Sequence, residues 1–438
     1  MALQAVILAA GSGSRIRALT EDTPKALLPI ANMPMIWYPL QLLEKAKFTE
    51  ALVVTRELEQ TKIQNTLEEI HCTIKLDYAT IPDDGDSGTA DTLRYIKDKI
   101  QSDVLLISCD LITDASLHLV IDLHRTYDST LTMLFAPMPQ PTINTIPGGN
   151  HNKNIEKDIV GFDENGNRIL FMASEADFEE SITFRKSVLK RHPFMEMRSD
   201  LLDAHLYIIK KSVIDYLEEK PSISAIKGEL IPDLVDKQFS KAKNQEAELS
   251  KSEEDSYTKL AREYSSWNDH CGDLEDSYHG NSCYGYIMDG GFCIRANTMW
   301  DYCEANRQVP GKLSELSANN EIPQMGPDVQ IPFTAKVAPD CVIGKGTDVA
   351  DKVVAKRSVI GMNCKLSENV KVIDSIIMND VNIEGGANLN DCIVLPMVKI
   401  GTKCELKDCI IGTGYEVKSD STLSGATLPE QNRMMEIE

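Results

Sequence analysis

The feature that most constrains the fold is a repeat near the C-terminal end. From Val337 onward, aliphatic residues return every five or six positions, and the pattern closes when position i is compared with position i+17. Three series follow it: Ile343, Ile360, Ile377, Val394 and Ile411; Val349, Leu366, Ile383, Ile400 and Val417; and Val372, Leu389, Leu406 and Leu423. Each coil then places one inward aliphatic residue on each of three faces and buries it only against neighbouring coils. The repeat predicts a left-handed parallel β-helix of hexapeptide type.

The positions of cysteine and histidine in the chain favour an assembly role for this repeat over a catalytic one. Cys341, Cys392 and Cys409 share one phase of the repeat, so we expect core or corner residues rather than a reactive set. Many hexapeptide β-helices are acyltransferases that rely on a histidine base. All eight histidines of this chain precede residue 330. A stack of coils with flat faces and two ends is suited to contacts between subunits.

The N-terminal stretch has the form of a phosphate-binding loop. The apolar run Val6–Ala10 predicts a buried strand. Gly11 and Gly13 follow, and glycines let a backbone turn sharply and present N–H groups to an anion. Arg15 and Lys25 add the two cations that a triphosphate requires. The spacing fits neither a Walker A loop nor a dinucleotide G-x-G-x-x-G.

The next hundred residues alternate between strand and helix patterns. Strands are predicted at Ala51–Thr55, Ile74–Ile81, Val104–Ser108 and Leu131–Ala136, and helices at Met35–Phe48, Glu57–Ile70 and Ser116–Tyr127. This alternation indicates βαβ units in a parallel sheet with helices on both faces. Ligands bind beyond the carboxyl ends of such strands. The Gly11 loop, Gly88-Thr89 and Asp110 all fall at predicted strand ends, so one nucleotide-sized cleft could collect them.

The string that begins at Gly11 resembles the signature of the sugar-nucleotidyltransferase (nucleotide-sugar pyrophosphorylase) family, roughly G-x-G-T-R-L-x-P-L-T and then P-K-x-L-L-P. The resemblance implies a Rossmann-like α/β nucleotidyltransferase domain. It also implies that Gly88, Thr89 and Ala90 match the G-T-A element that packs against the nucleotide, and that Asp110 matches a magnesium ligand. A helix N-cap without a ligand remains the alternative for Gly88, and a solvated carboxylate or N-cap for Asp110.

Several residues depart from the family pattern. Arg295 falls where the second metal-binding aspartate belongs when Gly291, Thr298 and Ala305-Asn306 are aligned. An arginine supplies its own charge and cannot hold the metal that assists nucleotidyl transfer. The sugar-gripping Glu-Lys-Pro is missing after the predicted hairpin Asp158–Met172. Glu219-Lys220-Pro221 is interpreted as a helix stop. His205 replaces a glycine of the sugar-contacting strand, and a core or hydrogen-bonded histidine is expected there.

We therefore expect a degenerate cleft without catalytic residues, metal or cofactor. Its vestigial nucleotide pocket is the set Gly11, Gly13, Arg15, Lys25, Gly88, Thr89 and Asp110, with Arg295 as the lost metal position.

Composition excludes some functions. The net charge of −22 and the pI near 4.8 disfavour direct binding to nucleic acid, because phosphates would be repelled. No apolar run approaches the roughly 18–20 residues of a membrane span, and no signal peptide is expected. Eleven cysteines without a C-x-x-C pair indicate reduced thiols in the cytosol. The stretch 246–276, with ten acidic and three basic residues, predicts a mobile insertion: a solvated loop or a docking surface for a basic partner.

A narrower resemblance, to the gamma-subunit family of eukaryotic translation initiation factor 2B, covers nearly the whole chain. It is carried by Ile36–Leu40, Pro82–Asp84, Gly88–Asp91, Ser108–Asp114 and Glu304–Pro310. The epsilon subunits of that factor have a helical exchange domain after the β-helix, whereas this chain stops about ten residues after its last coil. The resemblance implies a decameric guanine-nucleotide exchange complex in which this chain pairs with epsilon and helps to bind the initiation factor 2 GTPase.

Two alternatives remain open. One is an active sugar-nucleotide pyrophosphorylase with an unusual metal site. The other is a scaffold that still binds a nucleotide sugar as a regulatory ligand, which the retained Arg15 and Lys25 would favour. The expected organisation is a nucleotidyltransferase-like domain at 1–310 with surface insertions near 139–157 and 240–282, a linker at 311–330, the β-helix at 331–428 and a tail at 429–438.

Overall fold

The computed structural model describes residues 3–70, 72–82, 88–138, 147–148, 157–175, 184, 186–239, 281–318 and 324–429. Contacts divide the chain into two compact units. The first unit comprises Met1–Ala10, Leu42–Pro139 and Ile155–Cys293, and the second comprises Gly11–Gln41, Gln140–Asn154 and Ile294–Glu438. The predicted acidic insertion at 246–276 lies outside the described residues, as does most of 139–157. The domain limits given above stay a prediction.

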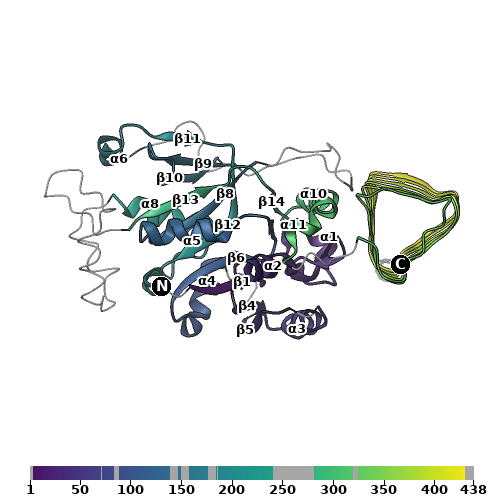
Figure 1. Cartoon of the computed structure of the whole chain (residues 1–438), viewed down its shortest axis with the longest axis horizontal. Coiled ribbons are helices and arrows are strands. Elements are labelled where there is room, and N and C mark those ends of the chain that lie inside the picture. Colours follow the sequence, from purple (N-terminus) through teal and green to yellow (C-terminus); the bar gives the residue numbers. More distant parts are fainter. Residues whose placement is uncertain are drawn as a thin grey trace, which may run out of the picture. The chain divides into compact units, whose positions relative to one another are not determined.

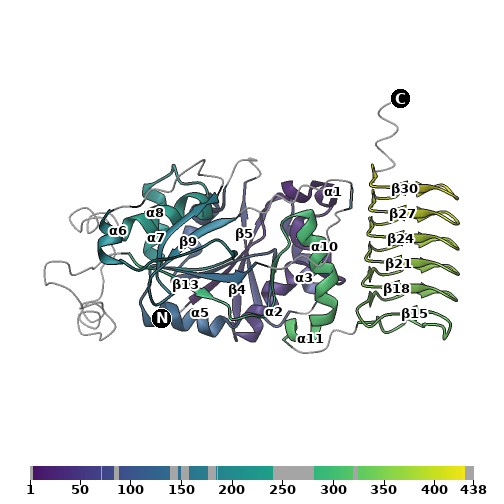
Figure 2. The ribbon, with the colours of Figure 1, turned by 90° about the horizontal axis from the view of Figure 1, so that it is seen from above.

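The first unit is built on a seven-stranded sheet with the order β13-β8-β12-β6-β1-β4-β5 (Figures 1 and 2). Its strands are β1 (Leu3–Leu8), β4 (Glu50–Arg56), β5 (Lys75–Ile81), β6 (Asp103–Ser108), β8 (Leu131–Pro137), β12 (Leu201–Ile209) and β13 (Cys283–Ile287). The short strand β7 (Leu111–Thr113) follows β6 in the sequence but is not part of this sheet. The strands predicted from the sequence are confirmed. The sheet is mixed, because β12 runs antiparallel to both β6 and β8.

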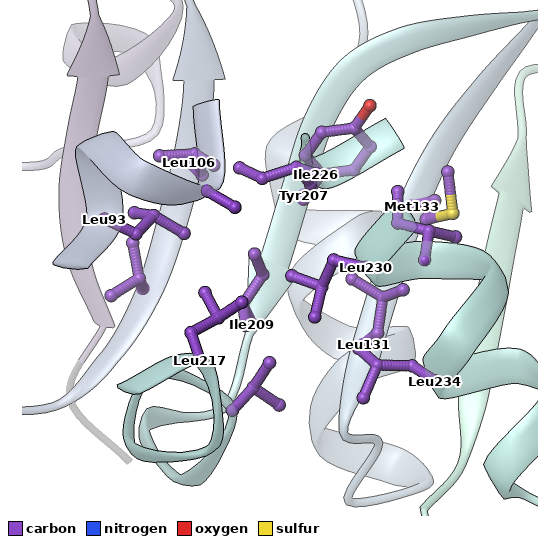
Figure 3. Packing of buried hydrophobic residues seen from close by; sticks show 14 of the residues in the cluster. Leu93, Leu106, Leu131, Met133, Tyr207, Ile209, Leu217, Ile226, Leu230 and Leu234 are labelled. Atoms are coloured by element: carbon purple, nitrogen blue, oxygen red, sulfur yellow. The ribbon is translucent and has the colours of Figure 1, made fainter. Parts of the chain in front are cut away.

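Helices of the first unit pack on this sheet and form its largest core. They are α3 (Gln60–Glu69), α4 (Thr89–Tyr95), α5 (Leu117–Thr126), α7 (Lys211–Glu219) and α8 (Ile231–Lys237), with the 3₁₀ turn η3 (Lys97–Lys99) and the π-helical η5 (Ile226–Leu230). Figure 3 shows Leu93 of α4 near Leu106 of β6, and Ile209 of β12 near Leu217 of α7. Each side chain is at most 1% exposed, and burying one is worth about 2 kcal/mol.

A second, smaller sheet follows the order β10-β9-β11. It consists of β9 (Asp158–Phe162), β10 (Ile169–Ser174) and β11 (Glu196–Arg198), next to the helix α6 (Lys186–Arg191) in Figure 1. The predicted hairpin is confirmed: β9 and β10 pair antiparallel, and Gly166 in their turn has φ 73°. The turn requires glycine there because left-handed backbone strains other residues.

A buried histidine is held in neutral form inside the first unit. His124 of α5 is 1% exposed, and its Nδ1 lies 2.9 Å from the hydroxyls of both Thr132 and Ser129. Burial lowers the pKa of His124 to about 4, with the positive charge of Lys210 adding to the effect. Because burial deprives a charged imidazole of solvation, protonation of His124 destabilises the folded state.

Stability of the full chain is therefore expected to fall as the pH drops from about 6.5 to about 4. The unfolded state binds the proton at higher pH than the folded state, so this contribution is complete above the unfolded pKa and shrinks below it. The loss reaches at most about 3 kcal/mol. Urea unfolding at several pH values measures it. His124→Gln should flatten the pH dependence, and an unchanged slope in that variant would contradict the assignment.

The C-terminal part of the second unit is a three-sided parallel β-helix, seen from the side in Figure 2. Its three sheets consist of β15 (Lys336–Val337), β18 (Val354–Lys356), β21 (Lys371–Ile373), β24 (Asn388–Asn390), β27 (Glu405–Lys407) and β30 (Thr422–Ser424); β16 (Val342–Ile343), β19 (Val359–Ile360), β22 (Ile376–Ile377), β25 (Ile393–Val394), β28 (Ile410–Ile411) and β31 (Thr427–Leu428); and β17 (Asp348–Val349), β20 (Lys365–Leu366), β23 (Asn382–Ile383), β26 (Lys399–Ile400) and β29 (Glu416–Val417).

Strand partners in neighbouring coils stand at positions i and i+17, as Ile360 with Ile377 shows, so the predicted repeat is confirmed. The predicted buried cysteines are also confirmed, since Cys341, Cys392 and Cys409 are at most 1% exposed. Each corner of the coil uses left-handed backbone at one fixed phase. The residues with positive φ are Gly346, Asn363, Asp380, Met397 and Gly414; Lys352, Asn369, Gly386, Lys403 and Asp420; and Arg357, Asp374, Asp391, Asp408 and Gly425.

The remaining elements of the second unit reach the coils through a few polar contacts. They are η1 (Ser14–Ile16), α1 (Arg17–Thr20), η2 (Lys25–Leu27), β2 (Pro29–Ile30), β3 (Met33–Pro34), α10 (Met299–Gln308), η7 (Val309–Lys312) and α11 (Leu313–Leu316). The boundary between the two units falls within α2 (Trp37–Lys45) and again within β14 (Cys293–Arg295). Asn32 donates to the carbonyl oxygen of Ile360 at 2.7 Å. Arg307 of α10 donates to Asp391 at 2.6 Å. These contacts join α10 and the turn between β2 and β3 to the β-helix.

Candidate functional site

The glycine-rich loop keeps the backbone form that its sequence predicts. Gly13 has φ 67° and caps η1, and its carbonyl oxygen accepts from the amide of Ile16 at 2.8 Å. A Cβ on Gly13 would lie 2.6 Å from Cγ2 of Thr20, so a side chain would both strain the backbone and collide. Gly11 differs, since nothing lies within 4 Å of its Cβ position. Gly13 therefore shapes the loop, whereas Gly11 borders open space.

The two cations of the loop have different surroundings. Arg15 is exposed at the surface. Lys25 is only 7% exposed, and its Nζ donates to Oδ1 of Asn297 at 2.7 Å. The amide of Asn297 in turn donates to the carbonyl oxygen of Arg295 at 2.8 Å. The half-buried Arg295 thus belongs to the short segment that receives the Lys25 ammonium. Lys25 is thus linked through Asn297 to the backbone of Arg295, the residue that the resemblance aligns with a metal-binding carboxylate.

Gly88 and Thr89 lie in the first unit, at the start of α4, and their polar groups are already used. The Gly88 amide donates to Asp91 at 3.0 Å, and Oγ1 of Thr89 accepts from the amide of Ile226 at 2.9 Å. A Cβ on Gly88 would lie 2.1 Å from the carbonyl oxygen of Ser224. This glycine is therefore required by close backbone packing, which supports the structural alternative for the G-T-A element.

Asp110 follows β6 and is fully buried. The hydroxyl of Ser108 donates to its Oδ1 at 2.6 Å. The preceding Cys109 is 3% exposed, and its amide donates to the carbonyl oxygen of Leu8 at 3.1 Å. The carboxylate is thus held by its own strand end. In the described residues no three His, Cys, Asp or Glu side chains are arranged to hold a metal ion.

A buried acid–base cluster in the first unit was not predicted from the sequence. Asp203 of β12 is 1% exposed, and the hydroxyl of Tyr207 donates to its Oδ2 at 2.6 Å. Burial raises the pKa of the Asp203 carboxyl, and the nearby Lys227 opposes that rise. Lys227 lies in η5 and pairs with the buried Asp158 at 2.8 Å. Only the tertiary fold brings these residues together, so no local motif marks them.

The structure also describes His205 and the Glu-Lys-Pro string at 219–221. His205 has φ 52°, in the left-handed region that favours the glycine of the family pattern. Its side chain is 16% exposed and its Nε2 lies 3.8 Å from Oδ2 of Asp203, so it is a half-buried residue beside a buried carboxylate rather than a fully buried core histidine. The helix α7 ends at Glu219, which confirms Glu219-Lys220-Pro221 as a helix stop.

The candidate site residues therefore fall in two units. Gly11, Gly13, Arg15, Lys25 and Arg295 belong to the second unit, and Gly88, Thr89 and Asp110 to the first. Their assignment to one vestigial nucleotide pocket stays a prediction. Arg15 and Gly11 are exposed, and nothing lies within 4 Å of a Cβ placed on Gly11.

Comparisons with known proteins agree with both parts of this architecture. A family model described as "Nucleotidyl transferase" matches residues 4–283, and one described as "EIF2B subunit epsilon LbH domain" matches residues 324–423. The chain is thus a nucleotidyltransferase-fold protein with a left-handed β-helix. None of the helices in the described part of the chain has the length and apolar character of a membrane span.

Comparison with individual curated proteins places the chain in one family among the proteins with a nucleotidyltransferase fold. Translation initiation factor eIF2B subunit gamma of Schizosaccharomyces pombe is 33% identical over 364 residues, which are 80% of this chain and 72% of the relative. The gamma subunit of Dictyostelium discoideum is 30% identical over 81% of this chain and 86% of its own length. A UTP–glucose-1-phosphate uridylyltransferase of Synechocystis is 25% identical over 53% of this chain and 55% of its own length. The chain belongs to the gamma-subunit family of eIF2B.

Proposed function

We propose that this chain is a non-enzymatic subunit of the cytosolic complex that exchanges GDP for GTP on translation initiation factor 2. It pairs with the epsilon subunit and helps to bind the GTPase substrate. Similarity to gamma subunits over four fifths of the chain is the observation that carries this proposal. The β-helix supports it, because its coils offer extended faces for contacts between subunits.

The state of the ancestral cleft supports the lack of enzymatic activity. Arg295 occupies the aligned position of a metal-binding aspartate, and the Lys25 ammonium already donates to Asn297. Nucleotidyl transfer needs cations that are placed where charge develops on the transferring phosphate. The Lys25 ammonium instead donates to the side chain of Asn297.

Purification of the tagged chain under native conditions, with identification of every stoichiometric companion, tests the proposal. We expect a longer homologous subunit with a helical C-terminal domain, together with the trimeric GTPase. Recovery of the chain alone or as a homo-oligomer would contradict the exchange-factor role. Assays with magnesium and a panel of sugar nucleotides would then test the uridylyltransferase-like activity that the Synechocystis relative suggests.

Restoring the metal position alone is not expected to create an enzyme. Arg295→Asp should leave pyrophosphorylase turnover at background, because the Glu-Lys-Pro motif is missing and His205 stands in place of glycine. Release of pyrophosphate from nucleoside triphosphate and sugar phosphate measures this, with an active bacterial enzyme as the positive control. Turnover in the unaltered chain would favour the enzymatic alternative. Calorimetry with nucleotide sugars checks the regulatory alternative, which absence of binding at millimolar concentration would remove.

A further inference from the structure

A ladder of small polar side chains runs along the β-helix, just after one of its corners. Its members stand 17 positions apart: Cys341, Ser358, Ser375, Cys392 and Cys409. The side chains of the last four each donate to the carbonyl oxygen two residues earlier, at 2.6, 2.7, 3.2 and 3.1 Å in chain order. The two cysteines of this group therefore make the same bond within the coil as the two serines.

Backbone amides connect the members of the ladder from coil to coil. The amide of Ser375 donates to the hydroxyl of Ser358 at 3.2 Å, and the amide of Cys392 donates to the hydroxyl of Ser375 at 3.1 Å. At the next step both side chains are thiols. Cys392 and Cys409 lie directly before the paired strands β25 and β28, and their thiols share a hydrogen bond. We call these two residues the stacked thiol pair.

The spacing of the stacked thiol pair suits a disulfide. Neighbouring strands of a sheet lie about 4.8 Å apart. The Cα atoms of bonded cysteines lie about 4.4–6.8 Å apart, so the two coils already stand at a suitable distance. Cys341 shares the phase of the ladder but has Ser358 in the next coil. It therefore provides a matched thiol that has no thiol next to it on the ladder.

The two thiols of the pair are chemically different. Their shared hydrogen bond lowers the pKa of Cys409, and the same bond raises the pKa of Cys392, with burial adding to the rise. The backbone amide of Ala426 in the next coil also favours the thiolate form of Cys409. A thiolate, rather than a thiol, is the nucleophile in sulfur chemistry. Cys409 is therefore the attacking member of the pair and Cys392 the resolving member.

Access to the pair depends on the end of the β-helix, because both thiols are at most 1% exposed. Leu423 and Leu428, in the last described coil, are only partly buried, whereas Leu406 and Ile411 at the same phases of the preceding coil are at most 2% exposed. Within the described residues, this last coil contacts another coil on one side only. Such a coil opens at a lower free energy than an internal one, and its opening uncovers Cys409.

We propose that the stacked thiol pair is a redox site, at which hydrogen peroxide converts Cys392 and Cys409 into a disulfide between neighbouring coils. The disulfide fixes the coil of Cys409 to the coil before it and opposes the opening of this end of the β-helix. Cys341 keeps the inert role that the sequence predicts for this phase. The redox site is independent of the exchange-factor role.

The reaction takes two steps. The Cys409 thiolate attacks one oxygen of the peroxide, the O–O bond breaks, and the leaving hydroxide takes up the thiol proton to form water. The sulfur of Cys392 then attacks the sulfenic sulfur of Cys409. The S–O bond breaks, and the hydroxide leaves as a second water with the proton of Cys392. The two thiols lose two electrons, which the peroxide gains, and a dithiol reductant restores both thiols.

Peptide mapping of the full chain after treatment with hydrogen peroxide tests the proposal. Trypsin cleaves after Lys399 and Lys407, so the two thiols of the pair fall on separate peptides. The folded chain is oxidised near neutral pH, its remaining thiols are alkylated in urea, and the digest is compared with and without dithiothreitol. We expect one linked peptide pair, joining Cys392 to Cys409, that dithiothreitol separates. Cys341 should be recovered as an alkylated thiol.

A chain that is unfolded in urea before oxidation is the reference for random linkage. If the folded chain gives the same mixture of links as this reference, the redox site is overturned. Complete alkylation of both members of the pair after peroxide treatment also overturns it. Links from either member to Cys341, Cys364 or Cys404 at the level of the expected link have the same meaning.

Serine variants separate the two roles and keep the ladder, because serine already makes these hydrogen bonds at positions 358 and 375. In Cys392→Ser, oxidation of Cys409 should stop at the sulfenic acid, which dimedone traps. In Cys409→Ser, Cys392 should be neither linked nor labelled by dimedone. Cys341→Ser should form the disulfide as the unaltered chain does. Equal dimedone labelling in Cys392→Ser and Cys409→Ser would overturn the assignment of Cys409 as the attacking thiol.

Discussion

Arg307→Ala is expected to lower the free energy of unfolding of the second unit by about 3–5 kcal/mol, because it leaves buried carboxylates without a counter-charge. The Arg307 side chain is 5% exposed, and it donates to Asp391 at 2.6 Å. Glu304, which is fully buried, lies 3.8 Å away. Burial raises the pKa of Asp391, and Arg307 is the main group that opposes this rise. Urea unfolding followed by the fluorescence of Trp300 on α10 measures the loss.

Arg357→Ala provides the comparison. Arg357 pairs with Asp374 at 2.6 Å at the same corner of the preceding coil, but its side chain is 55% exposed. Asp374 is only 6% exposed, but water that reaches the exposed Arg357 already screens this pair, so a smaller loss than for Arg307→Ala is expected. The double variant Arg307→Met, Asp391→Asn should recover part of the stability that Arg307→Ala loses, because it removes one charge along with its partner. Equal losses in Arg307→Ala and Arg357→Ala would contradict the importance of burial.

Gly88→Ala is expected to destabilise the first unit by about 3 kcal/mol or more, the upper range for overpacking. The added Cβ would lie 2.1 Å from the carbonyl oxygen of Ser224, and both partners are backbone that cannot rotate away. The same carbonyl accepts from the amide of Ala90 at 2.8 Å, so a shift would also break that hydrogen bond. Thermal unfolding and co-purification with companions measure the effect.

Gly11→Ala is the matched control from the same vestigial motif. Nothing lies within 4 Å of its Cβ position, and its φ is not in the left-handed region, so the change should leave stability within about 0.5 kcal/mol. The contrast separates a glycine required for packing from one that borders space for a ligand. If both variants were equally destabilised, the packing argument for Gly88 would be wrong.

The β-helix could be predicted from the sequence because its period is local. Each coil repeats the positions of the coil before it, and neighbours in sequence are neighbours in space. The strands around β1 were predictable for a related reason, since a short apolar run between turn residues marks a buried strand. The direction of β12 was not, because nothing in Leu201–Ile209 records that it pairs antiparallel with β6.

The candidate site was predictable only in part. Gly13 marks its turn, and its backbone is left-handed with φ 67°. The assignment of Gly88 to a nucleotide-binding motif stays a prediction, and its packing against Ser224 depends on residues that are distant in the sequence. The cluster of Asp158, Asp203 and Lys227 joins two strands and a π-helix, and each residue is unremarkable in its own segment. Ion pairs between residues that are far apart in the sequence produce no periodic pattern from which they could be predicted.

The corners of the β-helix limit how this part of the chain can change in length. Left-handed residues recur at fixed phases, and Asp374, Asp391 and Asp408 occupy one of them. Insertion of a single residue would move every later aliphatic residue off its inward position and every later corner onto a residue without the required backbone. Removal of a whole coil instead preserves both series. Viable length variants of the β-helix should therefore differ only by whole coils, that is, in steps of one repeat.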